Sequence, residues 1–351
     1  MDVQQNTIKA DACQSFIGTV LASLGADAGP ASRWAEMLVE TSLLGIDSHG
    51  IRMLDRYVQH IDAGGIDVSA KPTTLRDEGS CLCIDGHQGL GHLAADYATN
   101  IAVERAERHG ISCVTAKNCN HTGACGVYVR HAALNGHIGI CTTVSKALMA
   151  PWGGKEQLIG VSPIAVAAPI ANRPPFLFDA ATSVTAMGKV TMAADHKQSI
   201  PDGWALDGDG NPTTDPLQAR QGSLLPIGTY KGYALAMSLE ILAAVLSGGL
   251  FAHDVPSWIK QPEDPMGGSF TAIAINIAAF LDVSVFKERL DEWMETLTQS
   301  SRRDGFQRIY YPGEMEAETY ALRSKSGIPV DTFTAEAFQR LAARFGVPSI
   351  V

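Results

Sequence analysis

The chain has 351 residues, of which 46% are hydrophobic, and it carries a formal net charge of −10 at pH 7. This length and composition supply apolar material for one large core or for two to three closely packed domains, and they exclude a disordered or fibrous chain. An acidic chain without a clustered basic segment is not expected to bind nucleic acid or an anionic membrane surface. An anionic small-molecule substrate would therefore need cations placed locally at its site.

Seven cysteines are scattered through apolar stretches without a C-x-x-C pair, which is typical of reduced thiols in a cytoplasmic protein and argues against a structural metal site. Cys81 and Cys83 alternate in "SCLCID", so both thiols should lie on one side of a strand. The N-terminal segment lacks a basic region followed by an apolar stretch, so no secretory signal is expected. The longest apolar run, "YALAMSLEILAAVL", contains Glu240 and is too short for a membrane span, so we expect a buried helix.

Residues 7–65 are expected to form three helices. The second begins at Pro30 and ends at Gly45, and "GIDSHGIRMLDRYVQHI" starts the third. The pattern changes near residue 72, where "TTLRDEG" and "SCLCIDG" predict short strands instead of helices. We therefore expect a domain boundary at about residues 70–75. The apolar stripe of the second helix consists of Trp34, Met37, Leu38 and Thr41.

Strands and helices then alternate, with "LAADYATNIAVERAERHG" and "VYVRHAALNG" as helices and "ISCVTA" and "IGICTTV" as strands. This succession predicts an α/β domain with a mixed sheet. Further along, "FTAIAINIAAF" is expected to be a strand with Ile273, Ile275 and Ile277 on one face.

Two helices are expected near the C-terminus. Asp282 should cap the first, and the second should begin at about Thr334. The expected core residues are Phe286, Leu290, Trp293 and Leu297 in the first helix and Phe338, Leu341 and Phe345 in the second.

Standard motifs for an α/β enzyme are missing from this sequence. It contains no GxGxxG for a dinucleotide, no GxxxxGK[ST] phosphate loop, no GxSxG elbow and no HExxH helix. Motif reading alone would therefore stop at an α/β enzyme of unspecified chemistry.

Four segments nevertheless bring together residues that suit catalysis. The first is "GIDSHGIRMLDRY", in which His49 could exchange a proton near neutral pH and Arg52 could clamp a carboxylate. The alternative is a capped helix start, with Asp47 or Ser48 as the cap and His49 merely exposed.

The second segment, "KNCNHTGACGVYV", places His121 in a glycine-rich turn that opens a helix, where it could orient a substrate oxygen. A turn histidine that bonds to its own loop is the alternative. The third runs from residue 145 to 190, where Asp179 follows the apolar "PFLF" and should have a buried partner such as a histidine. In the fourth, "LPIGTYKGYALAMSLE", two glycines flank Lys231 just before a helix, an arrangement that suits a phosphate or carboxylate.

The chain resembles the malate/L-lactate dehydrogenase family, also called sulfolactate dehydrogenase-like, in eight motifs that follow one another over nearly the whole sequence. These are "DSHGIR", "NHTGACG", "MAPWGG", "GVSPIAVAAP", "FDAATSVTAMGKV", "PDGWALDGDGNPTTDP", "LPIGTYKGY" and "YPGE". The resemblance implies NAD(P)-dependent interconversion of a small anionic 2-keto acid and its 2-hydroxy acid. It also implies a homodimer and an α/β fold that is not the Rossmann fold.

On this resemblance, a helical N-terminal domain (1–72), completed by residues 315–351, joins an α/β domain (73–314) that binds cofactor and substrate. His49 would be the proton donor, with Asp179 as its charge partner and His121 as the second histidine of the pocket. Ser48, Arg52 and Lys146 would contact the substrate. The cofactor, NAD(H) or NADP(H), would contact Ser162, Asp179, Ala180, Ala181, Thr182, Ser183, Lys231, Gly232, Pro312, Gly313 and Glu314.

The chain departs from the usual family pattern at several of these places. Relatives carry the substrate arginine two or three places after "SHG", and here Arg52 takes the nearer place while Met53 takes the other. Lys146 replaces an asparagine–proline segment and could serve a doubly anionic substrate or simply be solvated. Lys189 stands where cyclic-imine reductases tend to have an aspartate, which favours a hydroxy acid. A reductase of cyclic imino acids and a catalytically inactive relative are the alternatives.

Overall fold

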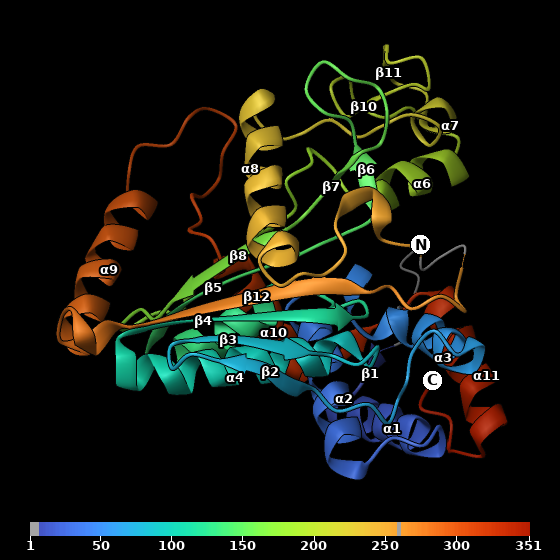
Figure 1. Ribbon diagram of the computed structural model, residues 1–351. Helices are drawn as coiled ribbons and strands as arrows, with labels where there is room; N and C mark the ends of the chain where they lie inside the picture. Colours follow the sequence, from blue (N-terminus) through green and yellow to red (C-terminus); the bar gives the residue numbers. More distant parts are fainter. Residues whose placement is uncertain (1–6, 258–260) are drawn as a thin grey trace.

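The computed structural model describes residues 7–257 and 261–351, and in these residues eleven α-helices surround a seven-stranded sheet (Figure 1). The strand order is β2-β3-β4-β12-β5-β8-β9. Only β3 and β4 pair in parallel, while the other neighbours are antiparallel. The predicted mixed α/β architecture is therefore confirmed. The strands are β2 (Thr73–Asp77), β3 (Cys81–Asp85), β4 (Ile111–Cys119), β12 (Gly268–Asn276), β5 (His137–Thr143), β8 (Ile164–Ala168) and β9 (Phe176–Ala180).

One face of the sheet packs on α4 (Gly91–His109) and α5 (Gly126–Leu134), which lie below it in Figure 1. Alternate strand residues point to these helices, such as Ile84 and Val114, which are both fully buried. The residues between them point to the other face of the sheet, where Cys81 and Cys83 lie on the same side, as expected. The buried stripe of α4 is mostly alanine, which lets the helix approach the strands closely.

The N-terminal helices and the C-terminal end of the chain pack against each other. Phe16 and Phe338 stack with ring centroids 5.1 Å apart, and β1 pairs with β13 in antiparallel fashion. The three predicted N-terminal helices and the last helix are present, whereas the short β1–β13 pair was not predicted. We retain the division into 1–72 with 315–351 and 73–314 as a proposal. The elements are β1 (Thr7–Ile8), α1 (Ala10–Ser23), α2 (Ala28–Leu43), α3 (Leu54–Ala63), α10 (Glu314–Ser326), β13 (Ile328–Pro329) and α11 (Thr332–Phe345).

Two stretches, residues 147–160 and 187–224, form a small lobe above the sheet in Figure 1, around a second cluster of buried apolar residues. The strands β8 and β9 lie between these stretches in the sequence and belong to the main sheet. This cluster includes Met149, Val190 and Leu224. These short elements are not predicted by the sequence pattern, because strands of two or three residues leave almost no periodic signal. They are β6 (Ala147–Met149), β7 (Ile159–Gly160), α6 (Met187–Asp195), β10 (Ala205–Leu206), β11 (Pro212–Thr213) and α7 (Pro216–Ala219).

The expected buried helix at "YALAMSLEILAAVL" is only half buried, which corrects the prediction. It consists of α8 (Tyr230–Glu240) and a π-helical turn (Ile241–Val245). Ala236 and Ala243 are fully buried, whereas the exposed fractions of Tyr230 and Ile241 are 55% and 54%. The outer apolar residues therefore face away from the core of this chain. No helix among the described residues has the length and apolar character that a membrane span requires.

The expected core stripe of α9 (Val283–Thr298) is also wrong. Trp293 and Leu297 are 60% and 42% exposed, while the neighbouring Met294 is buried against Tyr311. Asp282 occupies the N-cap position without a capping hydrogen bond. Ile277 lies in a 3₁₀ turn after β12 rather than in the strand. The periodicity correctly predicts a helix, but its apolar side is not the side that this chain covers.

Candidate active site

The loop that carries His49 is built on a close contact with the end of α2. After α2, Gly45 adopts φ +86° and a 3₁₀ turn (Asp47–His49) follows. A Cβ atom at Gly50 would lie 2.0 Å from the Ser42 hydroxyl, and that hydroxyl accepts a hydrogen bond from the amide of Ile51 at 2.9 Å. Glycine at position 50 is therefore needed for this approach.

Asp47 anchors the same loop to the C-terminal part of the chain. Its two carboxylate oxygens accept hydrogen bonds from the Arg323 guanidinium at 2.6 and 3.0 Å, and Arg323 also donates to the carbonyl of Ser42. The alternative of a capped helix start fails, because Met53 is the N-cap of α3 and makes no side-chain capping bond. The loop is thus held by an ion pair between α10 and Asp47.

The loop that carries His121 connects β4 to α5 and is anchored on both sides of the histidine. The Asn120 amide nitrogen donates to three backbone carbonyls at 2.6–3.1 Å, and its oxygen accepts from the amide of Met266 at 2.9 Å. On the other side, the Tyr128 hydroxyl donates to the carbonyl of Thr122. A buried loop with its polar groups satisfied in this way holds one conformation.

His49 and His121 meet face to face. Their ring centroids are 5.6 Å apart, their planes are 29° from parallel, and both side chains are half-buried. Nδ1 of each ring is next to a hydroxyl, that of Ser48 at 2.8 Å from His49 and that of Tyr57 at 2.6 Å from His121. The two histidines that the sequence singled out separately therefore form one site.

Tyr57 also belongs to a buried aromatic wall behind the imidazoles. The indole nitrogen of Trp34 donates to Nδ1 of His92 at 3.1 Å, and both rings lie edge-on to Tyr57 at 5.1 and 5.3 Å. Gly123 fits against this wall, because a Cβ there would lie 2.3 Å from Nε2 of His92. We call His49, His121, Tyr57, His92 and Trp34 the histidine cluster.

Burial makes the imidazoles of the cluster poor bases. It lowers the pKa of His49, and it holds the pKa of His121 well below its usual value, with further lowering by His49 and His92. Burial lowers the pKa of His92 to about 3, again with a contribution from His49. Rings this close cannot all carry a charge, so neutral imidazoles are the resting state at neutral pH.

Asp179 does not pair with His49, which corrects the predicted charge pair. Its Oδ2 accepts a hydrogen bond from the amide of Gly126 at 2.7 Å, at the start of α5, and no hydrogen bond or ion pair links it to His49. Burial raises the pKa of Asp179 to about 6, partly offset by the Gly126 bond and increased further by Glu316. Asp179 therefore fixes the start of the helix that follows the His121 loop.

The two predicted substrate cations lie in different surroundings. Arg52 is 50% exposed, forms an ion pair with Asp331 at 3.1 Å and lies over the ring of Phe333 at 5.5 Å. Lys146 is half-buried at the end of β5, and in the described ranges its ammonium group makes no hydrogen bond or ion pair. Sequence reasoning overlooked Arg56, which lowers the pKa of His121 and so contributes positive potential to the site.

One group of predicted cofactor residues lies between the small lobe and α8. The hydroxyl of Ser162 is buried next to Glu240 at 3.4 Å, and the backbone of Thr182 bonds to Val161 at 3.1 Å. The buried Thr182 hydroxyl has no hydrogen-bond partner in the described part of the chain. This group also contains Ala180, Ala181 and Ser183, whose hydroxyl donates to the carbonyl of Thr185.

The start of α8 lies next to that group, because the amide of Ile227 donates to the carbonyl of Thr182 at 2.9 Å. Thr229, at the N-cap, has φ +63°, a conformation that costs energy for a β-branched residue and often marks a functional position. Lys231 is exposed in the first turn, and Gly232 packs directly on the carbonyl of Ile227. A helix start with an exposed lysine suits a phosphate group.

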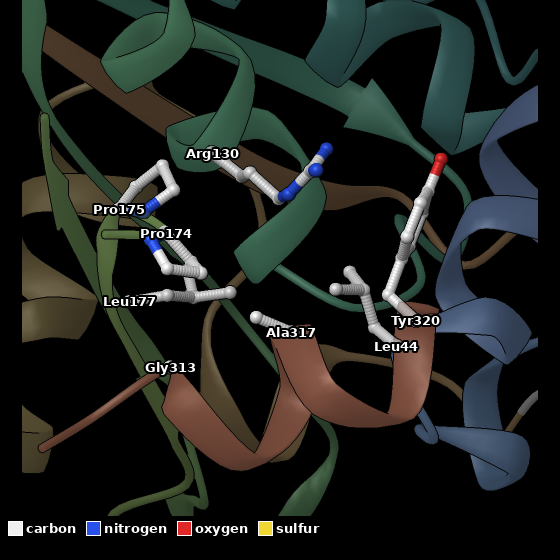
Figure 2. A pocket seen from close by; sticks show the side chains of 8 residues that line it. All are labelled: Leu44, Arg130, Pro174, Pro175, Leu177, Gly313, Ala317 and Tyr320. Atoms are coloured by element: carbon white, nitrogen blue, oxygen red, sulfur yellow. The ribbon is translucent and has the colours of Figure 1, made fainter. Parts of the chain in front are cut away.

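The second group lies at the other end of β9, where the amide of Leu177 donates to the carbonyl of Pro312 at 3.0 Å. Gly313 has φ +96° and is buried against Leu177, while Glu314 pairs with Arg308. A pocket of about 220 Å³ lies here. Figure 2 shows Ala317 on α10 opposite Arg130 on α5 in this pocket. Its lining residues are Leu44, Arg130, Pro174, Pro175, Leu177, Gly313, Ala317 and Tyr320, without either histidine of the proposed pair.

Comparison with known proteins gives a consistent result over the full length. A sequence model described as malate/L-lactate dehydrogenase matches residues 8–339. The chain is 36% identical to malate dehydrogenase of Pyrococcus horikoshii over 99% of its length and 98% of the relative. It is 34% identical to L-sulfolactate dehydrogenase of Methanocaldococcus jannaschii, covering 92% and 93% of the two chains.

Solved structures show the same similarity. Malate dehydrogenase from Pyrococcus horikoshii superposes with a TM-score of 0.90 at 34% identity and covers 99% of this chain and 98% of its own. Δ1-Piperideine-2-carboxylate reductase from Pseudomonas syringae superposes with a TM-score of 0.85 at 28% identity, covering 96% of this chain and all of its own.

Proposed function

Because the chain belongs to the malate/L-lactate dehydrogenase family and is therefore an oxidoreductase, we propose that it interconverts a small 2-hydroxy acid and the corresponding 2-keto acid with a nicotinamide cofactor. The stacked pair of His49 and His121 is the observation that supports this most directly. Oxidation of an alcohol releases a proton together with a hydride, and an imidazole that is neutral at pH 7 can accept that proton.

In the proposed reaction, His49 exchanges the proton and His121 holds the reacting oxygen. During oxidation, neutral His49 takes the hydroxyl proton while the C–H bond gives up its hydride and the carbonyl forms. During reduction, the imidazolium returns the proton to the oxygen. The nicotinamide, when bound, accepts or supplies the hydride. Since burial lowers the pKa of His49, the neutral form needed for oxidation dominates near pH 7.

The residues around β9 fit a dinucleotide, NAD(H) or NADP(H). The Thr182 hydroxyl is buried without a hydrogen-bond partner among the described residues, which is costly unless a ligand pairs with it. The exposed Lys231 and the first amides of α8 suit the pyrophosphate. The turn from Pro312 to Glu314 borders the pocket in Figure 2, which suits another apolar part of the cofactor.

We propose an acid with a second anionic group as the substrate. Lys146 supports this, because a half-buried lysine without an anionic partner in the described residues is otherwise unfavourable. The named relatives include malate and L-sulfolactate dehydrogenases, whose substrates have two anionic groups. Lys146→Met should therefore raise the KM for a doubly anionic acid about tenfold and change the KM for lactate or pyruvate little. Equal effects on both would contradict this assignment.

The second candidate is reduction of a cyclic imino acid. It is favoured by the structural similarity to Δ1-piperideine-2-carboxylate reductase. Lys189, in a motif where that branch tends to have an aspartate, argues for the hydroxy acid instead. Turnover of the imine without turnover of any keto acid would establish the second candidate.

The function is tested with a panel of keto acids and cyclic imines, each with NADH and with NADPH, for the native protein and His49→Ala. We expect turnover of at least one keto acid and a loss of kcat on the order of 10²-fold or more in the variant. Full activity in His49→Ala would contradict the assigned proton donor. Absence of turnover with every compound would contradict the function itself.

We also propose that the chain forms a homodimer. Exposed apolar side chains on α8, on its π turn and on α9 support this, among them Ile241, Val245 and Trp293 at 54%, 58% and 60% exposure. An apolar surface of this kind is typical of a protein interface. Sedimentation of the native protein should give twice the monomer mass. The Trp293→Glu variant should sediment with a lower average mass, because the charge disrupts the apolar interface. A native protein that sediments as a monomer would contradict this proposal.

A further inference from the structure

We propose that Tyr57 is a positioning residue that keeps the proton of neutral His121 on Nε2, so that this N–H can bind the reacting oxygen of the substrate. The proposal rests on the function given above for His121, and it assigns a role to a residue that no motif indicated. Tyr57 looks like an ordinary buried residue of an amphipathic helix in the sequence.

The geometry of Tyr57 leaves its hydroxyl little freedom. The side chain is 1% exposed, and its ring lies edge-on against Trp34 and His92 at interplanar angles of 83° and 77°. The hydroxyl oxygen lies 2.6 Å from Nδ1 of His121. Burial raises the pKa of Tyr57 well above its usual value, so the group stays a phenol with a proton to donate.

A phenol that donates to Nδ1 determines the tautomer of the neutral ring. Nδ1 then acts as the acceptor and the imidazole proton must lie on Nε2. A neutral imidazole with Nε2–H can donate to a carbonyl oxygen, and its donation strengthens as negative charge develops there. His121 thereby acts as an electrophile while His49 exchanges the proton.

The charges around His121 keep it neutral. Among the described residues, the titratable groups that lower its pKa after burial are His49, His92 from α4, and Arg56 and His60 from α3. All four are cationic when charged. A carboxylate in the place of Tyr57 would instead stabilise the imidazolium, so a neutral hydroxyl is the suitable neighbour for a ring that must stay neutral.

The test uses Tyr57→Phe, with Tyr128→Phe as the matched control. Both remove one buried hydroxyl from the surroundings of the same loop, but Tyr128 bonds to the carbonyl of Thr122 rather than to an imidazole. Nitrogen-15 NMR of histidine-labelled protein reports which ring nitrogen carries the proton, and His121→Gln assigns the signal.

We expect His121 to carry its proton on Nε2 in the native protein and in Tyr128→Phe, and to show a mixture of tautomers in Tyr57→Phe. The kcat of Tyr57→Phe should fall about fivefold to tenfold, with little change in KM for the acid. The same tautomer in all three proteins would overturn the proposal.

The NMR measurement on the native protein alone is decisive if Tyr57→Phe does not fold, since a proton on Nδ1 would also overturn the proposal. Because this measurement needs neither substrate nor cofactor, its result does not depend on the proposed reaction. Failure of every compound in the activity panel would instead refute the function and leave the tautomer of His121 as measured.

Discussion

The histidine cluster and the cofactor side of the site differ in how far the chain satisfies its own polar groups. In the cluster, Nδ1 of His49, His121 and His92 each has a partner within the chain, and of the buried His92 only Nε2 has no hydrogen-bond partner among the described residues. On the other side, within the ranges described, neither the Thr182 hydroxyl nor the ammonium group of Lys231 has one. The proton-transfer residues are thus arranged before any ligand binds, whereas the cofactor residues leave polar groups for the ligand.

The largest expected effect comes from removing an imidazole of the histidine cluster. His49→Ala and His121→Ala should each lower kcat on the order of 10²-fold or more, because one removes the proton acceptor and the other removes the oxygen ligand. The double variant should lose little more than either single variant, since the two rings act on the same atom. His196→Ala, at an exposed position on the small lobe, is the control and should retain its kcat. Additive losses would show that the rings act independently.

The next effect concerns the cofactor side. Lys231→Met should raise the KM for the nicotinamide cofactor about tenfold with little change in kcat, because a lost charge at a helix start weakens phosphate binding. Lys325→Met, at an exposed position in the last turn of α10, is the matched control. An unchanged KM in Lys231→Met would place the pyrophosphate elsewhere.

A smaller effect is expected from loosening the His49 loop. Arg323→Met removes the bonds to Asp47 and to the carbonyl of Ser42, and it should lower the free energy of unfolding by about 1–2 kcal/mol. Urea denaturation measures this loss. The loss is small because Asp47 is 47% exposed, so solvent screens its ion pair with Arg323. A kcat that falls along with stability would show that the loop also orients His49.

The smallest effect at neutral pH comes from the buried wall. Burial lowers the pKa of His92 to about 3 in the folded protein, below its value of about 6.5 in the unfolded chain. Between about pH 6.5 and pH 3 the unfolded chain therefore binds one proton more than the folded protein at this residue. The free energy of unfolding should fall as the pH falls below about 6.5. His92→Asn can still accept from Trp34 and should reduce the slope of unfolding free energy against pH by up to about 1.4 kcal/mol per pH unit. Identical slopes below pH 6 would show that His92 is not neutral in the folded protein.

The sequence predicted the framework of the fold well because regular elements leave a periodic signal. β4, β5 and α4 were all found where alternation or helical spacing indicated them. The same signal failed for α9 and α8, since periodicity shows that a helix has an apolar side but not that this chain covers it. Trp293 and Ile241 are exposed for that reason.

For the site, the sequence identified the chemically capable residues but not their partners. His49 and His121 were singled out separately, and only the packing of the turn after α2 against the loop after β4 brings them together. The predicted partner of Asp179 is wrong, because its actual partner is the backbone amide of Gly126 at the start of a helix, and a sequence pattern does not indicate which backbone amide a carboxylate will bind. Tyr57 was missed since its hydroxyl acts through the fold.

The most direct test of the proton-transfer site is a crystal structure of the protein with a reduced nicotinamide cofactor and oxalate as an analogue of the keto acid. We predict an oxalate oxygen within hydrogen-bond reach, roughly 2.6–3.2 Å, of Nε2 of His49 or His121. Oxalate bound on the nicotinamide with both imidazoles more than about 6 Å away would contradict this assignment, because neither ring could then exchange a proton with the substrate.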